Sequence, residues 1–134
     1  MTPQGPNRVQ VFGRRDSRPT QKALRFFADR RIPVSFVEVR ARAPQIGELR
    51  RFVEGLGAEA VMETGGGRYR ELGLGYMRLE PVDVLERLRD DPGLLRLPLV
   101  RFGNELAAGV DEQRWRTIVT AVSTVSGGSS EQNR

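Results

Sequence analysis

The sequence predicts one α/β domain, in which a β-α-β unit and a β-β-α unit are separated by a helical insertion. Three observations carry this prediction: short alternating apolar runs near the N-terminus, apolar residues at helical spacing over 46–56, and two short apolar runs joined by a Gly-Asn pair. A length of 134 residues fits one compact domain. We expect this domain to span 8–125, and the glycine- and serine-rich segment 126–134 to form a disordered tail.

The first part of the domain is expected to be β-α-β. Residues 8–13 (RVQVFG) alternate in polarity and stop at a glycine, which is typical of a strand. Ser17 is a good helix cap, and apolar residues at helical spacing predict a helix over 17–31. Pro33 ends that helix and a second strand follows over 34–40 (VSFVEVR). A β-α-β unit of this kind is expected to be parallel.

The middle of the chain is expected to be helical. Apolar residues at i, i+3, i+6, i+7 and i+10 predict a helix over 46–56, and Gly57 stands where a C-terminal cap would. The glycines at 65–67 break the chain, and apolar clusters over 69–74 indicate one helical turn. Pro81 is placed to open another helix.

The last part is expected to be β-β-α. Residues 97–102 and 105–108 indicate two short strands joined by a turn at Gly103-Asn104. Asp111 is expected to cap a final helix whose apolar side includes Trp115. We expect Trp115, like the Phe26-Phe27 pair, to belong to the core and not to stack on bases.

The composition removes several kinds of chemistry. The chain has no cysteine and no histidine, which excludes thiolate nucleophiles, disulfides, Cys/His zinc sites and the usual general base at neutral pH. We therefore expect neither a metal nor a cofactor. No apolar run reaches the length of a membrane span, and Met1–Asn7 lacks the order of a signal peptide, so the expected location is the cytoplasm, without membrane contact.

The net charge of +5 comes from 21 arginines and a single lysine, Lys22, set against 17 acidic residues. A basic surface favours acidic partners or nucleic acid. The same arginine bias also arises from GC-rich codons, and the arginines are scattered along the chain. No nucleic-acid-binding motif is present, so direct nucleic-acid binding is not expected.

Several segments resemble the arsenate reductase (ArsC)/Spx family. Residues 61–74 (VMETGGGRYRELGL) are similar to the family segment L-L-R-T-K-G-x-x-Y-K-E-L-G-L, and residues 91–100 (DPGLLRLPLV) to its "hPgLLrRPiv" segment. In the first of these segments, seven residues match in register: Thr64, Gly66, Tyr69, Glu71, Leu72, Gly73 and Leu74. The resemblance covers roughly residues 8–118 and implies a thioredoxin-like fold, β-α-β…β-β-α with a helical insertion.

The resemblance also shows which reactive groups have been lost. Ser17 stands where the reductases have the cysteine that attacks arsenate, and Thr20 stands at the second position of the C-x-x-C pair found in Spx-type members. A hydroxyl has a far higher pKa than a thiol, and no base is expected nearby to activate it. Reductase activity is therefore not expected.

The family's oxyanion-binding arginines are also replaced. Glu63, Leu97 and Val110 stand at the three positions, while Arg96 matches the first arginine of the Spx-like "LLRRP" pattern. The resemblance implies that Pro98 follows a cis peptide bond and faces the vestigial active-site loop.

The loop before the first helix carries Arg14, Arg15 and Arg18, where backbone N–H groups and the helix dipole favour an anion. These residues could form a relic oxyanion site. Alternatively they are solvated side chains, and Ser17 or Asp16 is only a helix cap.

Two functions remain open. The first is a noncatalytic protein that binds a protein partner, for which the resemblance to Spx suggests the C-terminal domain of the RNA polymerase α subunit. The second is an arsenate reductase or glutaredoxin-like homologue that retains oxyanion binding but little or no reductase activity. Arg14, Arg15, Arg18 and Arg96 are the candidate binding residues in both cases.

Overall fold

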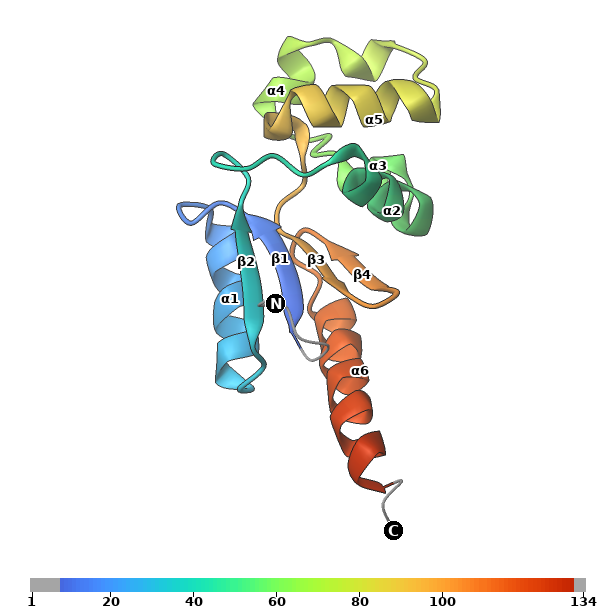
Figure 1. Ribbon diagram of the computed structural model, residues 1–134. Coiled ribbons are helices and arrows are strands. Elements are labelled where there is room, and N and C mark those ends of the chain that lie inside the picture. The colour runs from blue at the N-terminus through green and yellow to red at the C-terminus, as the bar shows by residue number, and fades with distance from the viewer. Residues whose placement is uncertain (1–7, 132–134) are drawn as a thin grey trace.

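A computed structural model of the chain describes residues 8–131, and shows a sheet flanked by helices with a helical lobe above one end of the strands (Figure 1). Its elements, in chain order, are β1 (Val9–Gly13), α1 (Arg18–Asp29), β2 (Val34–Glu38), α2 (Ile46–Leu56), α3 (Ala58–Val61), α4 (Gly67–Glu71), η1 (Leu74–Tyr76), α5 (Pro81–Asp90), η2 (Pro92–Leu94), β3 (Leu99–Phe102), β4 (Glu105–Ala108) and α6 (Glu112–Glu131). This order confirms the expected β-α-β, helical insertion and β-β-α.

The four strands lie in the order β2-β1-β3-β4. Strands β1 and β2 pair in parallel, whereas β3 is antiparallel to both β1 and β4. The hairpin predicted at Gly103-Asn104 is present, and Gly103 has φ 61°, a left-handed conformation that glycine adopts without steric cost. The parallel β-α-β unit and the hairpin are therefore both confirmed.

Two apolar clusters cover the two faces of the sheet. Val9 and Val11 of β1 pack with α1 and α6, in a cluster that contains Phe26, Phe27 and Trp115. The expectation that these three aromatic residues are core is confirmed, since Trp115 and Phe27 are fully buried and Phe26 is 8% exposed. Alternate residues of a strand point to opposite faces, so Phe12 instead joins the cluster under the helical lobe.

The ends of the strands differ slightly from the sequence expectation, for identifiable reasons. Strand β2 ends at Glu38 and not Arg40, because Gly13 ends β1 and pairs with Glu38 as the last pair of the parallel ladder. Strand β3 begins at Leu99 and not Leu97, since Pro98 has no N–H to donate to a neighbouring strand.

The helical lobe contains two short elements that the sequence does not predict, α3 and η2. Helix α3 has only four residues and so shows no helical period. Helix α2 matches the prediction, beginning with a Gln45/Glu48 capping box and ending at Gly57 with φ 94°. The single turn expected over 69–74 is two short pieces, α4 and η1.

The final helix is longer than expected. Asp111 caps it, because its carboxylate accepts a hydrogen bond from the Arg114 backbone N–H at 3.1 Å. The packing of Trp115 and Ile118 fixes the first turns of α6 on the sheet. Each further residue then adds one helical hydrogen bond, and the helix continues to Glu131. The disorder that the sequence predicts from Ser126 onward stays a prediction. Residues 1–7 and 132–134 lie outside the described part of the chain.

No helix within residues 8–131 combines the length and the apolar character that crossing a membrane requires.

Candidate functional site

Residues at the ends of β1 and β2, and residues directly next to β3 and β4, line the end of the sheet beneath the helical lobe. Gly13 pairs with Glu38, and the pairing of Phe12 with Leu99 places the next residues, Gly13 and Pro98, side by side. The Gly109 backbone N–H donates to the Pro98 carbonyl at 2.9 Å. The Leu97-Pro98 peptide bond is cis, as the resemblance implies. Pro98, one of the vestigial active-site positions, therefore lies beside Gly13, which leads into the loop before α1.

Ser17 and Thr20 form the start of α1, and both hydroxyls already have partners. The Ser17 Oγ accepts a hydrogen bond from the Thr20 backbone N–H at 3.3 Å, which makes Ser17 the N-cap. The Thr20 Oγ1 accepts from the Arg14 backbone N–H at 3.3 Å, and Thr20 is fully buried. Both residues stabilise the turn between β1 and α1, and the described residues provide no cysteine or histidine to activate either hydroxyl.

Gly13 is needed for the close approach of this turn. A Cβ atom at Gly13 would lie 2.5 Å from the Thr20 Oγ1 and 2.6 Å from its methyl carbon. Since real Cβ atoms do not approach other atoms so closely, the absence of a side chain at Gly13 is what allows Thr20 to pack under the loop.

The loop arginines differ in their surroundings. Arg14 forms an ion pair with Asp16 at 3.1 Å. Arg15 places its guanidinium 4.5 Å from the centre of the Phe36 ring. Arg18 is exposed, and no hydrogen bond or ion pair of its side chain occurs among residues 8–131. Of the three predicted binding residues, Arg18 is thus the most available.

Two carboxylates and a further arginine, which sequence reasoning missed, complete this edge. Arg40 lies 3.2 Å from Asp16 and 3.4 Å from Glu38, while the Arg15 backbone N–H donates to Glu38 at 2.9 Å. The hydrogen bond from Arg14 holds the pKa of Asp16 below its usual value, and the one from the Arg15 backbone does the same to the pKa of Glu38. The parallel β1–β2 register is the one sequence signal that could have placed Glu38 beside this loop.

A further ion pair lies on the lobe side of the edge. Arg96 Nε is 3.8 Å from Glu63 Oε1, and the Arg96 guanidinium also donates to the Thr64 hydroxyl at 3.4 Å. The aliphatic part of the Arg96 side chain packs over Gly109. A Cβ atom at Gly109 would lie 2.9 Å from the Cγ and Cδ atoms of Arg96. Glu63, which replaces one of the family's arginines, therefore faces Arg96 directly.

The remaining two replaced positions carry no charge. Leu97 is partly buried and packs against the lobe core, whereas Val110 is 47% exposed. No group of three or more acidic residues in the described part of the chain is arranged to hold a metal ion.

The site has a helix N-terminus, a cis-proline and a glycine turn at one end of a mixed sheet. These features define the class: a thioredoxin-like domain with a helical insertion. The sequence model of the ArsC family matches residues 12–118, so the chain belongs to the ArsC family. No curated protein matches the sequence.

Solved structures share the fold at low sequence identity. An arsenate reductase from Vibrio cholerae has a TM-score of 0.74 and 20% identity, over 83% of this chain and 97% of that one. An ArsC-family-related protein from Bacteroides fragilis has a TM-score of 0.73 and 20% identity, over 82% and 96%. An arsenate reductase-related protein from Brucella melitensis has a TM-score of 0.61 and 16% identity, over 81% and 92%. At these identities the likeness establishes the fold alone.

Proposed function

We propose that this protein is a noncatalytic member of the ArsC family that acts by binding a protein partner. The observation that carries the proposal is the state of the vestigial site: the chain has no cysteine, and the hydroxyls of Ser17 and Thr20 serve the turn that starts α1. A thioredoxin-like domain without a thiol retains its shape and its surface, and these are sufficient for binding.

Retained oxyanion binding is the second candidate and has less support. An anion at the sheet edge would have to compete with carboxylates that already face the arginines: Asp16 faces Arg14 and Arg40, and Glu63 faces Arg96. These carboxylates also repel an anion.

The exposed ridge of α1 supports an acidic partner. Arg18, Lys22 and Arg25 are all exposed and follow one another at i, i+4 and i+7, which places them on one side of the helix. Lys22 pairs with Glu112 of α6 at 3.2 Å, whereas the side chains of Arg18 and Arg25 make no hydrogen bond or ion pair within residues 8–131. The resemblance to Spx makes the C-terminal domain of the RNA polymerase α subunit the first partner to test, and such a partner would imply a cytoplasmic protein.

The proposal is tested by a direct titration of the chain with that purified domain, beside a pull-down from lysate read by mass spectrometry. Recovery of RNA polymerase and saturable binding in the titration would support the proposal that the chain binds the RNA polymerase α subunit. Recovery of a thiol reductase instead would favour the oxyanion-binding homologue. If the purified domain does not bind and the pull-down recovers no RNA polymerase, the RNA polymerase assignment is refuted.

The interface is tested with the double variant Arg18→Glu/Arg25→Glu. Both side chains are exposed, so the fold should survive the reversal while association slows strongly. Wild-type association should also slow as salt rises to about 0.5 M, where the Debye length is roughly 4 Å. Arg50→Glu, on the exposed side of α2, is the matched control. Loss of binding in this control alone would move the interface to α2.

A further inference from the structure

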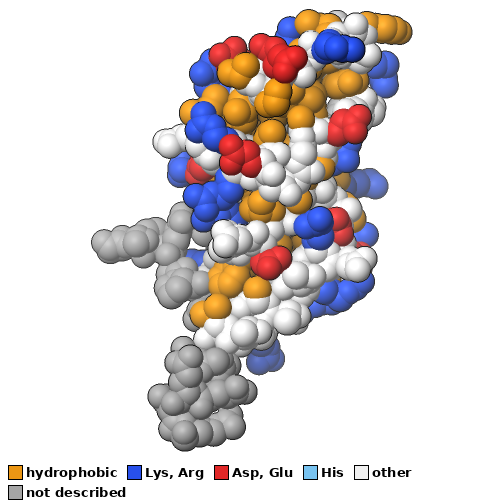
Figure 2. Space-filling view, turned by 90° about the vertical axis from the view of Figure 1, so that its right-hand side faces the viewer, with side chains coloured by type: hydrophobic (Ala, Val, Ile, Leu, Met, Phe, Trp, Pro, Cys, Tyr) orange, Lys and Arg blue, Asp and Glu red, His pale blue; other side chains and the backbone are white. Residues whose placement is uncertain are grey.

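Exposed apolar side chains are concentrated on the helical lobe. Within residues 8–131 only five large hydrophobic side chains are exposed, and three of them lie close together in sequence: Tyr76 at 98%, Met77 at 45% and Val82 at 58%. On the face shown in Figure 2, hydrophobic side chains gather over the lobe, with charged ones among them. An apolar cluster rimmed by charges is typical of a protein-binding surface.

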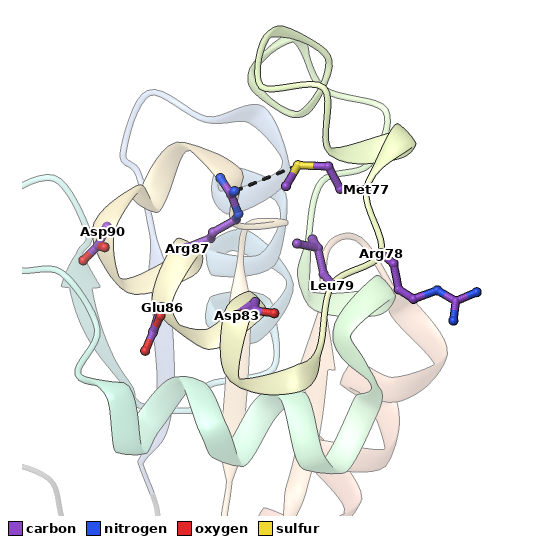
Figure 3. A pocket seen from close by; sticks show the side chains of 7 residues that line it. All are labelled: Met77, Arg78, Leu79, Asp83, Glu86, Arg87 and Asp90. Carbon is purple, nitrogen blue, oxygen red and sulfur yellow. Dashed lines mark hydrogen bonds between the residues drawn. The ribbon is translucent and has the colours of Figure 1, made fainter.

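A hollow of about 450 Å³ lies in the same segment of the lobe, and Met77 is one of its lining residues. Met77 and Leu79, from the segment that precedes α5, form its apolar side, and α5 forms the other side (Figure 3). The charged lining residues are Arg78, Asp83, Glu86, Arg87 and Asp90. The hollow therefore combines apolar surface with a row of charges along one helix.

The charges of the hollow are mainly negative. Arg78 extends away from the other lining side chains, while Arg87 reaches toward the Met77 sulfur at 3.9 Å (Figure 3). Asp90 pairs with Arg89 at 2.9 Å. Glu86 is exposed and makes no hydrogen bond or ion pair with any described residue, although its charge acts on nearby Arg89, so its carboxylate is accessible to a cation.

The lobe as a whole has the opposite charge to the rest of the chain. Residues 46–95 contain ten acidic and seven basic residues, a net charge of −3, whereas the rest of the chain has 15 basic and seven acidic residues, a net charge of +8. Complementary potentials steer association and select partners. An acidic segment would be repelled here, although the exposed ridge of α1 would attract it.

We propose that Tyr76, Met77, Val82 and the adjoining hollow form a docking site for a partner segment that carries lysine or arginine beside apolar side chains. The apolar residues of the segment cover Tyr76 and Val82, and its cations meet Glu86 and Asp90. This surface is separate from the arginine ridge of α1, and the proposal holds whether or not that ridge binds an acidic partner.

The experiment selects a random peptide library on the wild-type chain, with counter-selection on Tyr76→Ser/Val82→Ser. Both side chains are mostly exposed, so the variant should keep the fold, which circular dichroism checks. The enriched peptides should combine basic and apolar residues. One synthetic representative is then titrated against each variant, and its contacts are mapped by amide chemical shifts.

We expect the affinity of that peptide to fall about tenfold in Tyr76→Ser/Val82→Ser and also in Glu86→Lys. The matched control Val110→Ser removes an apolar side chain of similar exposure, 47%, outside the lobe, and should bind as the wild type does. Failure to enrich peptides, enrichment of acidic ones, or shifts outside residues 76–90 would overturn the proposal.

Two further measurements test whether a second copy of this chain or a lipid membrane binds this surface instead. Sedimentation that shows dimerisation lost in Tyr76→Ser/Val82→Ser would assign the surface to a second copy of this chain and overturn the proposal. Binding to anionic or neutral lipid vesicles that depends on the same two residues would overturn it in favour of a membrane. We expect the chain to be a monomer in sedimentation and not to bind either kind of vesicle. The α1 variant Arg18→Glu/Arg25→Glu should bind the peptide normally, so the outcome is independent of the proposed RNA polymerase partner.

Discussion

Arg96 and Glu63 form an ion pair between the two segments that border the helical lobe, with Arg96 Nε 3.8 Å from Glu63 Oε1. Glu63 stands where the resemblance places an arginine of the reductases, so the resemblance implies that a carboxylate replaces an anion-binding group. Arg14 and Arg40 repeat this arrangement with Asp16. Arg14, Arg40 and Arg96 thus have carboxylate partners within the chain, whereas Arg18 has none among residues 8–131.

Removal of the Glu63 charge should uncover a weak anion site. In Glu63→Gln, Arg96 loses its carboxylate partner and becomes available to an oxyanion. We expect arsenate or sulfate to bind about tenfold tighter than to the wild type by calorimetric titration. Glu59→Gln, which removes an exposed carboxylate elsewhere in the lobe, should change nothing. Equal affinities in all three proteins would mean that Glu63 does not block an anion.

Thiol chemistry should be absent and only partly recoverable. We expect no arsenate or disulfide reduction by the wild type with glutathione, glutaredoxin or thioredoxin as donor, because Ser17 and Thr20 replace both thiol positions. Turnover above a protein-free blank would contradict this expectation.

Ser17→Cys should give a reactive thiol but little arsenate turnover. Since Ser17 is the N-cap of α1, the helix terminus should lower the thiol pKa below the value of about 8.5 for a free cysteine. The rate of alkylation by iodoacetamide as a function of pH measures this pKa. Ser123→Cys, an exposed position inside α6, is the control and should titrate higher. Identical titrations would show that the helix start has no effect on the thiol.

Gly13→Ala should destabilise the fold by about 1–3 kcal/mol, because its Cβ would lie 2.5 Å from the Thr20 Oγ1. The penalty should shrink in the Thr20→Ala background, where the clashing atoms are gone. Gly47→Ala is the matched control, since nothing lies within 4 Å of its Cβ and alanine favours a helix by up to about 1 kcal/mol. Urea unfolding compares the four variants, Thr20→Ala alone among them, with the wild type, and equal effects at Gly13 and Gly47 would rule out the clash.

Stability should fall in acid partly through the sheet edge. The pKa values of Asp16 and Glu38 are lowered in the folded chain, so their contribution is present above the ordinary carboxyl range and is lost as pH falls through the folded values. Urea midpoints at pH 7 and pH 3 should differ less in Asp16→Asn than in the wild type. Asp29→Asn removes an exposed carboxylate without an ion pair in the described chain, and should leave the difference unchanged. The same acid loss in Asp16→Asn as in the wild type would contradict the role of Asp16.

The sequence by itself determined the order of elements, the hairpin at Gly103 and the start of α1 at Ser17, because each depends on residues that are neighbours along the chain. The absence of a thiol also follows from the sequence alone, since it depends only on the amino-acid composition. Helix α3 was missed because four residues are too few for a period.

The tertiary structure alone decided which charges meet. Glu63 and Arg96 are brought together where the segments on either side of the lobe pair, with the Glu63 N–H donating to the Leu94 carbonyl at 2.8 Å and the Arg96 N–H to the Val61 carbonyl at 2.8 Å. Asp16 meets Arg40 only because β1 and β2 end together. Ion pairs depend on distance in space, and that distance is set by strand register and lobe packing between segments far apart in the sequence.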